Sequence, residues 1–74
     1  MRKTMSEEST KVDGWKLKVQ VDKLSGGELE LNAYYVNNER YVDYVINNEI
    51  LTPAALKELI LMLIRAAKEA KVKV

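Results

Sequence analysis

The fold is decided by residues 15–36, which read WKLKVQVDKLSGGELELNAYYV. Apolar and polar residues alternate over positions 15–22, which is the two-residue period of a half-buried strand. A second strand is predicted over residues 28–36, after the turn Ser25-Gly26-Gly27. A two-residue loop at Gly26-Gly27 would mix the faces, whereas a three-residue loop keeps the apolar residues of both strands on one face. The pairs in that register are Leu17 with Tyr35, Val19 with Ala33, and Val21 with Leu31.

A third strand is predicted over residues 40–47, where apolar residues recur at Val42, Tyr44 and Ile46. Asn37-Asn38 is a turn indication, since Asn tolerates the left-handed conformation of a tight hairpin. A two-residue turn there keeps the apolar face continuous. It pairs Ala33 with Val42, Leu31 with Tyr44, and Leu29 with Ile46. Residues 49–51 are either a fourth strand or a connection.

Thr52 and Pro53 predict the start of a helix that ends near Ala70, because Thr is a favourable N-cap and Pro fits the first helical position. One apolar stripe is expected to pack on the sheet. It consists of Leu56, Leu59, Ile60, Leu63, Ala67 and Ala70. Leu61 and Met62 lie on its flanks, and are either ordinary exposed residues or in contact with a second partner. The expected class is α+β, a curved antiparallel meander of three to four strands with a C-terminal helix packed on one face.

The domain organisation is simple. Residues 1–13, MRKTMSEESTKVD, are polar and without period, which predicts a disordered tail. Residues 14–74 then form a single α+β domain, in which residues 71–74 are too short to assign. A chain of 74 residues with no cysteine lacks a disulfide to support its small core, so we expect oligomerisation.

The composition excludes several classes of protein. Without cysteine or histidine the chain cannot form a zinc finger, a disulfide framework, or a Ser-His or Cys-His nucleophile pair. The longest apolar run, residues 59–64, is too short to cross a bilayer. No apolar run follows Arg2 and Lys3 as in a secretory signal. We therefore expect a soluble cytoplasmic protein with no membrane partner.

Catalysis is not expected. The predicted register makes Asp22 and Glu30 solvated neighbours on the outer sheet face, where no pocket perturbs them. Two carboxylates are fewer ligands than hard cations need, and Ser25-Gly26-Gly27 leads into a strand rather than the helix of a phosphate-binding loop. We predict no enzyme activity, no metal and no cofactor. An enzyme subunit whose site lies on another chain is a less favoured alternative.

The outer sheet face offers a candidate binding surface. The predicted register places Lys18, Tyr34 and Tyr41 in one cross-strand row, with Lys16 beside it and Arg40 near the hairpin end. Bases stack on tyrosine rings while Lys or Arg meets the phosphates, so the row suits unpaired nucleic acid. Alternatively, the tyrosines are a stabilising cross-strand pair or are covered by a partner subunit.

The net charge of +1 is the sum of unequal blocks. Residues 1–26 carry a net charge of +2, residues 27–52 carry −4, and residues 53–74 carry +3. This distribution argues against a broad duplex-binding surface and allows a narrow basic track along the strand at residues 15–22.

The strand around residues 29–35 and the helix entry Ile50-Leu51-Thr52-Pro53, followed by Leu56, Leu59 and Ile60, resemble the PC4-like transcriptional coactivator family. The similar stretch covers about residues 15–67. The resemblance implies a dimer with curved sheets that binds single-stranded DNA through basic and aromatic sheet residues. The chain differs from the family at Asn47-Asn48-Glu49, where the family tends to be basic.

The leading hypothesis is a dimeric, non-enzymatic binding module for single-stranded nucleic acid. Its contact face would comprise Lys16, Lys18, Tyr34, Arg40 and Tyr41. Leu61 and Met62 would belong to the dimer interface. The alternative is a small protein–protein interaction or regulatory module with no nucleic-acid role.

Overall fold

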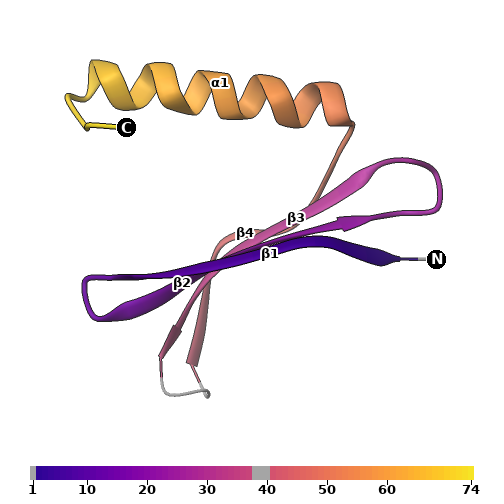
Figure 1. Ribbon diagram of the computed structural model, residues 1–74, viewed down its shortest axis with the longest axis horizontal. Helices are drawn as coiled ribbons and strands as arrows, with labels where there is room; N and C mark the ends of the chain where they lie inside the picture. Colours follow the sequence, from indigo (N-terminus) through magenta and orange to yellow (C-terminus); the bar gives the residue numbers. More distant parts are fainter. Residues whose placement is uncertain (1, 38–40) are drawn as a thin grey trace.

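The computed structural model describes residues 2–37 and 41–74. Within these residues, four antiparallel strands form one open sheet in the order β1-β2-β3-β4, and a helix follows (Figure 1). The elements are β1 (Lys3–Val12), β2 (Trp15–Lys23), β3 (Leu29–Asn37), β4 (Tyr41–Leu51) and α1 (Pro53–Glu69). The predicted α+β class is confirmed, and residues 49–51 are the end of β4.

β1 corrects the prediction that residues 1–13 are a disordered tail. The strand pairs with β2, and Val12 lies opposite Trp15 across a two-residue turn. Asp13 and Gly14 form this turn with φ values of 51° and 83°, as a type I′ hairpin turn requires at both central positions. The side chains of β1 gave no apolar period because nearly all are exposed. The dipeptide Asp-Gly was the local indication of this hairpin.

The register between β2 and β3 is as predicted. Leu17 lies opposite Tyr35 and Val21 opposite Leu31. The backbone N–H of Gly27 donates to the carbonyl of Leu24 at 3.0 Å, and the N–H of Leu24 donates to the carbonyl of Glu28 at 2.9 Å. Gly27 has a φ of 87°, which closes the three-residue loop in the left-handed conformation that favours glycine.

The predicted register between β3 and β4 is wrong. Tyr44 lies opposite Tyr34, whereas the expected two-residue turn pairs it with Leu31. A register shift follows, so that Ile46 lies opposite Ala33. The extra residue on β4 places Tyr44 and Ile46 on opposite faces despite their two-residue spacing. The alternation of apolar and polar residues along β4 therefore does not identify the residues that share one face of the sheet.

The helix begins and ends as predicted. The hydroxyl of Thr52 accepts a hydrogen bond from the backbone N–H of Ala55 at 3.1 Å, which satisfies one of the first N–H groups of the helix. At the other end Lys71 has a φ of 61°, and the N–H of Val72 donates to the carbonyl of Ala67 at 2.8 Å. This is a Schellman motif with Lys71 at the left-handed position.

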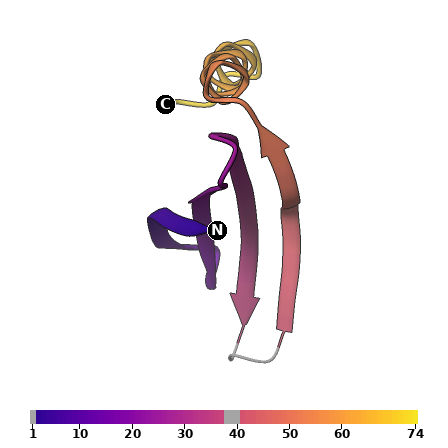
Figure 2. The same cartoon turned by 90° about the vertical axis from the view of Figure 1, so that its right-hand side faces the viewer.

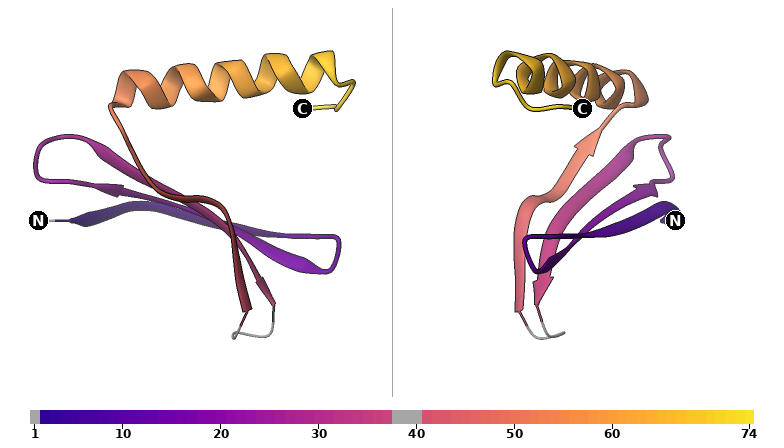
Figure 3. Two further views of the ribbon diagram at one scale, coloured as in Figure 1. Left: turned by 180° about the vertical axis from the view of Figure 1, so that it is seen from behind. Right: turned by 60° about the vertical axis from the view of Figure 1, so that its left-hand side comes forward.

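The place of the helix differs from the expectation. α1 lies beyond one end of the sheet rather than across a face (Figure 2), and two further directions show the same separation (Figure 3). No residue of α1 is buried. In the predicted stripe, Ile60 and Leu63 are 49% and 57% exposed. Among the described residues, Leu31 and Ala33 are the buried apolar ones. The apolar helix surface is therefore uncovered within the single chain.

The molecule is open in shape. Its radius of gyration is 13.7 Å, against about 11 Å for a compact domain of this length. Its accessible surface is 6018 Å², against about 4,700 Å² for a folded monomer of this mass.

Among the described residues, no helix is long and apolar enough to cross a membrane.

Candidate functional site

One row of side chains crosses the face of the sheet opposite to Leu31 and Ala33. Lys18 on β2 lies opposite Tyr34 on β3, which lies opposite Tyr44 on β4. The Lys18 ammonium is 6.0 Å from the centre of the Tyr34 ring. The rings of Tyr34 and Tyr44 are 5.4 Å apart between their centres and tilted by 48°. We call Lys18, Tyr34 and Tyr44 the lysine–tyrosine row.

Further basic groups lie beside this row. Lys16 precedes Lys18 by two positions on the same face, and Lys11 on β1 lies opposite Lys16. Both are exposed, and neither forms an ion pair with another described residue. Oε1 of Glu7 lies 3.5 Å from Nζ of Lys18, so Glu7 offsets part of the charge of Lys18. Lys11 and Lys16 are therefore the cations on this part of the face that are available to a phosphate.

Three predicted contact residues, Lys16, Lys18 and Tyr34, lie on this face. Tyr41 does not join the row, because the register of β4 places it opposite Asn37. Tyr44 takes the expected place of Tyr41 opposite Tyr34. Arg40 lies outside the described residues. The sequence could not distinguish the tyrosines, since the choice depends on the length of the loop between β3 and β4.

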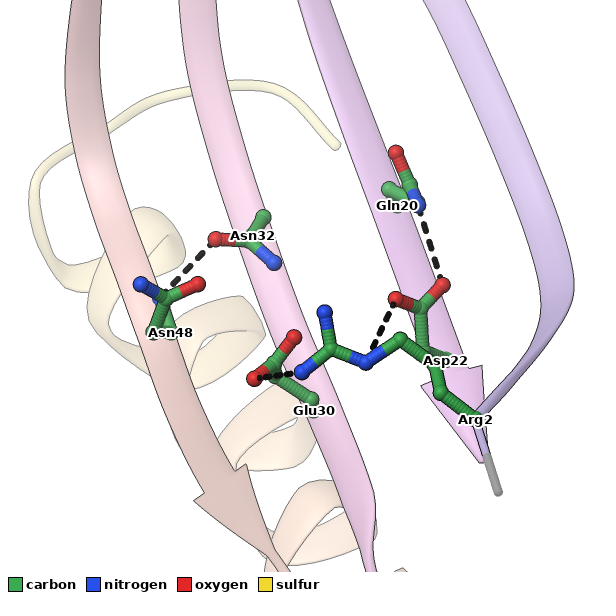
Figure 4. A network of polar contacts seen from close by, with 6 residues as sticks. All are labelled: Arg2, Gln20, Asp22, Glu30, Asn32 and Asn48. Atoms are coloured by element: carbon green, nitrogen blue, oxygen red, sulfur yellow. Dashed lines mark hydrogen bonds and ion pairs between the residues drawn. The ribbon is translucent and has the colours of Figure 1, made fainter. Parts of the chain in front are cut away.

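A network of polar side chains lies farther along the same face (Figure 4). Arg2 reaches from the start of β1 and places its guanidinium between Asp22 of β2 and Glu30 of β3. Its Nη2 is 2.7 Å from Glu30 Oε1, and its Nε is 3.6 Å from Asp22 Oδ2. Gln20 donates from Nε2 to Asp22 Oδ1 at 3.0 Å. Side chains thus connect β1, β2 and β3.

Asp22 and Glu30 correct a second expectation. They lie opposite each other as predicted, but their side chains are only 3% and 5% exposed rather than solvated. Glu30 Oε2 is buried and accepts no hydrogen bond from the described residues. Local sequence could not indicate this burial, because 28 positions separate Arg2 from Glu30. The described residues contain no group of three or more carboxylates that could hold a metal ion.

The helix α1 carries a large exposed apolar surface. Leu61 and Met62, the predicted dimer contact, are 38% and 51% exposed. Their neighbours Ile60 and Leu63 are exposed as well. A helix with this much uncovered apolar surface is typical of an interface rather than of a solvated element.

No protein-family model, curated protein or solved structure matches the chain. What the chain binds must therefore be inferred from the chemistry of its own surfaces.

Proposed function

We propose that the chain is a dimeric, non-enzymatic module that binds single-stranded nucleic acid along the lysine–tyrosine row. The observation that supports this proposal most is the row itself, an ammonium and two tyrosine rings on one sheet face. Bases stack on aromatic rings with little regard to sequence, each contributing about 1–3 kcal/mol, while lysines pair with phosphates. Tyr34 and Tyr44 would supply the stacking surface, and Lys11 and Lys16 the charge.

The arrangement favours a single strand over a duplex. The exposed cations beside the lysine–tyrosine row lie on β1 and β2, whereas residues 27–52, which include β3 and β4, carry a net charge of −4. A duplex needs many phosphate contacts across a broad surface, while a single strand can follow a narrow track and turn its bases onto the tyrosines. The resemblance to the PC4-like family points to the same ligand.

The accessible surface supports a dimer. The chain exposes 6018 Å², about 1,300 Å² more than a compact monomer of its mass. A standard interface buries about 800 Å² on each partner, and obligate dimers bury more. A second copy covering the helix would account for the excess, and Leu61 and Met62 would lie within that contact.

Salt-dependent binding tests the proposal. Fluorescence anisotropy measures the binding of a labelled mixed-sequence strand. A strand of about 20 nucleotides is long enough for the proposed track. If Lys11 and Lys16 each neutralise one phosphate, affinity should fall about sevenfold between 50 and 200 mM salt. No detectable binding at low salt would overturn the proposal.

A matched pair of variants separates the row from the fold. Tyr34 and Tyr35 are neighbours on β3 that face opposite sides of the sheet. Tyr34→Leu and Tyr44→Leu should each weaken binding about tenfold, which corresponds to one lost stacking contact. Tyr35→Leu should leave it within about twofold. Circular dichroism checks that all variants stay folded, and equal losses at Tyr34 and Tyr35 would contradict the proposed face.

A protein-interaction module is the second candidate, and the uncovered helix favours it. In that case the helix surface around Leu61 and Met62 would be occupied by a different protein. A chain that is monomeric and binds no single strand at low salt would support this candidate over the first.

A further inference from the structure

An open pocket of about 300 Å³ lies on the opposite side of the sheet from the lysine–tyrosine row. The described residues that line it are Val12, Asp13, Trp15, Tyr35 and Asp43. We call it the Trp15 pocket. Its volume is at the lower end of the range of small-ligand sites, which limits an occupant to a small group.

Two cross-strand pairs and one contact between aromatic rings form the pocket. The turn at Asp13 sets Val12 opposite Trp15 at the end of the first hairpin. Tyr35 lies opposite Asp43 across β3 and β4. The Trp15 and Tyr35 rings are 6.4 Å apart between centres and inclined at 71°. The pocket therefore has two aromatic walls at an edge-to-face angle, an apolar residue, and a carboxylate on each of two sides.

The charged residues that line the pocket, among those that the structure describes, are both acidic. None of the lining residues that the structure describes is basic, and neither Asp13 nor Asp43 forms an ion pair with another described residue. The faces of aromatic rings attract cations, and nearby carboxylates add to that attraction. Phosphate groups would be repelled, which separates this pocket from the nucleic-acid surface proposed above.

We propose that the Trp15 pocket binds a small organic cation, namely an alkylated ammonium group. Aromatic walls next to carboxylates are the arrangement by which proteins recognise quaternary ammonium groups. A primary ammonium or a metal ion holds its water strongly. Of the described lining residues, Asp13, Asp43 and the Tyr35 hydroxyl could replace only part of that water, because Val12 and the faces of the two rings offer no hydrogen-bond acceptor. A methylated ammonium is weakly hydrated and presents apolar methyl groups to these walls. The same chemistry occurs in a free small molecule and in a methylated lysine side chain.

Choline and its neutral carbon isostere, dimethylbutanol, test the role of the charge. Trp15 is the only tryptophan of the chain, so its fluorescence and its indole N–H resonance report on the pocket. Choline, titrated at constant ionic strength, should shift both in a saturable manner with a dissociation constant of about millimolar. Equal binding of the neutral isostere, or no saturable shift up to about 50 mM choline, would overturn the proposal.

A charge-matched control locates the site. Asp43→Asn removes a pocket carboxylate and should weaken choline binding about tenfold. Glu49→Gln removes one negative charge from the same strand outside the pocket lining and should leave binding unchanged. Equal effects of the two variants would show that the total charge of the chain attracts choline, and the pocket assignment would be wrong.

A peptide with a trimethylated lysine separates the two sources of the cation. Binding of this peptide at least as tight as that of choline, and loss of binding with the unmodified peptide, would assign the pocket to modified protein tails. Binding of choline with no binding of the peptide would assign it to small molecules. If neither probe binds, the pocket has no such function.

Discussion

Arg2 supplies the positive charge between two carboxylates that are almost fully buried. Its side chain is 56% exposed, whereas those of Asp22 and Glu30 are 3% and 5% exposed. Removing one partner of a buried ion pair leaves a charge without compensation, which costs more than the pair contributes. Because Arg2 is partly in water, we expect Arg2→Ala to lower the free energy of unfolding by about 2 kcal/mol. Urea denaturation measures this change.

Lys3→Ala is the matched control, because it removes the same charge from the next residue of an exposed strand. Its midpoint in urea should stay close to that of the unchanged protein. Arg2→Ala combined with Glu30→Gln should lower the free energy of unfolding by less than the sum of the two single changes. The reason is that Glu30→Gln removes the second negative charge beside Asp22, which Arg2→Ala would leave without a counter-charge. Equal midpoints for Arg2→Ala and Lys3→Ala would show that the network does not stabilise the sheet.

Single residues also show where prediction from sequence reached its limit. The opposition of Asp22 and Glu30 followed from the loop length and the two-residue period, which are local properties. The charge that pairs with them in this buried position comes from Arg2, which directly precedes β1 and is distant in sequence. The same holds for Asn48, whose backbone N–H donates to Asn32 Oδ1 at 2.8 Å across β3 and β4. Contacts of this kind have no local pattern.

At the scale of the elements, the register of the hairpin of β2 and β3 was predicted correctly, whereas the hairpin of β1 and β2 and the register of β3 and β4 were not. The three-residue loop around Gly27 fixed the register of β2 and β3, since one spacing alone kept the apolar face continuous. β1 was not predicted because its exposed side chains have no apolar period, and its local indication lies in the Asp13-Gly14 turn. β4 was misplaced because its extra residues break the rule that every second side chain shares a face.

Paired cysteines test the register of β3 and β4. The chain has no cysteine of its own, so an introduced pair reports without interference. Val36 lies opposite Val42, and directly opposed side chains can come within reach of a disulfide. Val36→Cys with Val42→Cys should therefore oxidise readily, as measured by mass spectrometry without reductant.

The alternative register provides the control. A two-residue turn at Asn37-Asn38 would instead bring Ala33 and Val42 together, and Ala33→Cys with Val42→Cys should stay reduced under the same conditions. If this second pair oxidises faster, the tyrosine that faces Tyr34 is Tyr41 rather than Tyr44. The lysine–tyrosine row would then return to the composition first expected from sequence.

At the scale of the whole molecule, the sequence predicted the apolar surplus of the helix but not the position of the helix. The stripe of α1 was expected to cover the sheet, yet α1 has no buried residue. An isolated helix of 17 residues is only marginally stable in water, because most helical stability comes from packing. A helix of this composition therefore needs a partner surface, which one chain does not provide.

The last prediction follows from that need. Light scattering should give the proposed dimer twice the chain mass of 8.5 kDa. Leu61→Glu together with Met62→Glu would bury charges in the contact, so the mass should fall to that of one chain and helical circular dichroism should weaken. Ala54→Glu together with Ala55→Glu adds the same charge in the exposed first turn, where the helix dipole favours it, and should keep the dimer. A mass of one chain for the unchanged protein would contradict the proposed dimer, and a dimer that survives the Leu61 and Met62 changes would place the interface elsewhere.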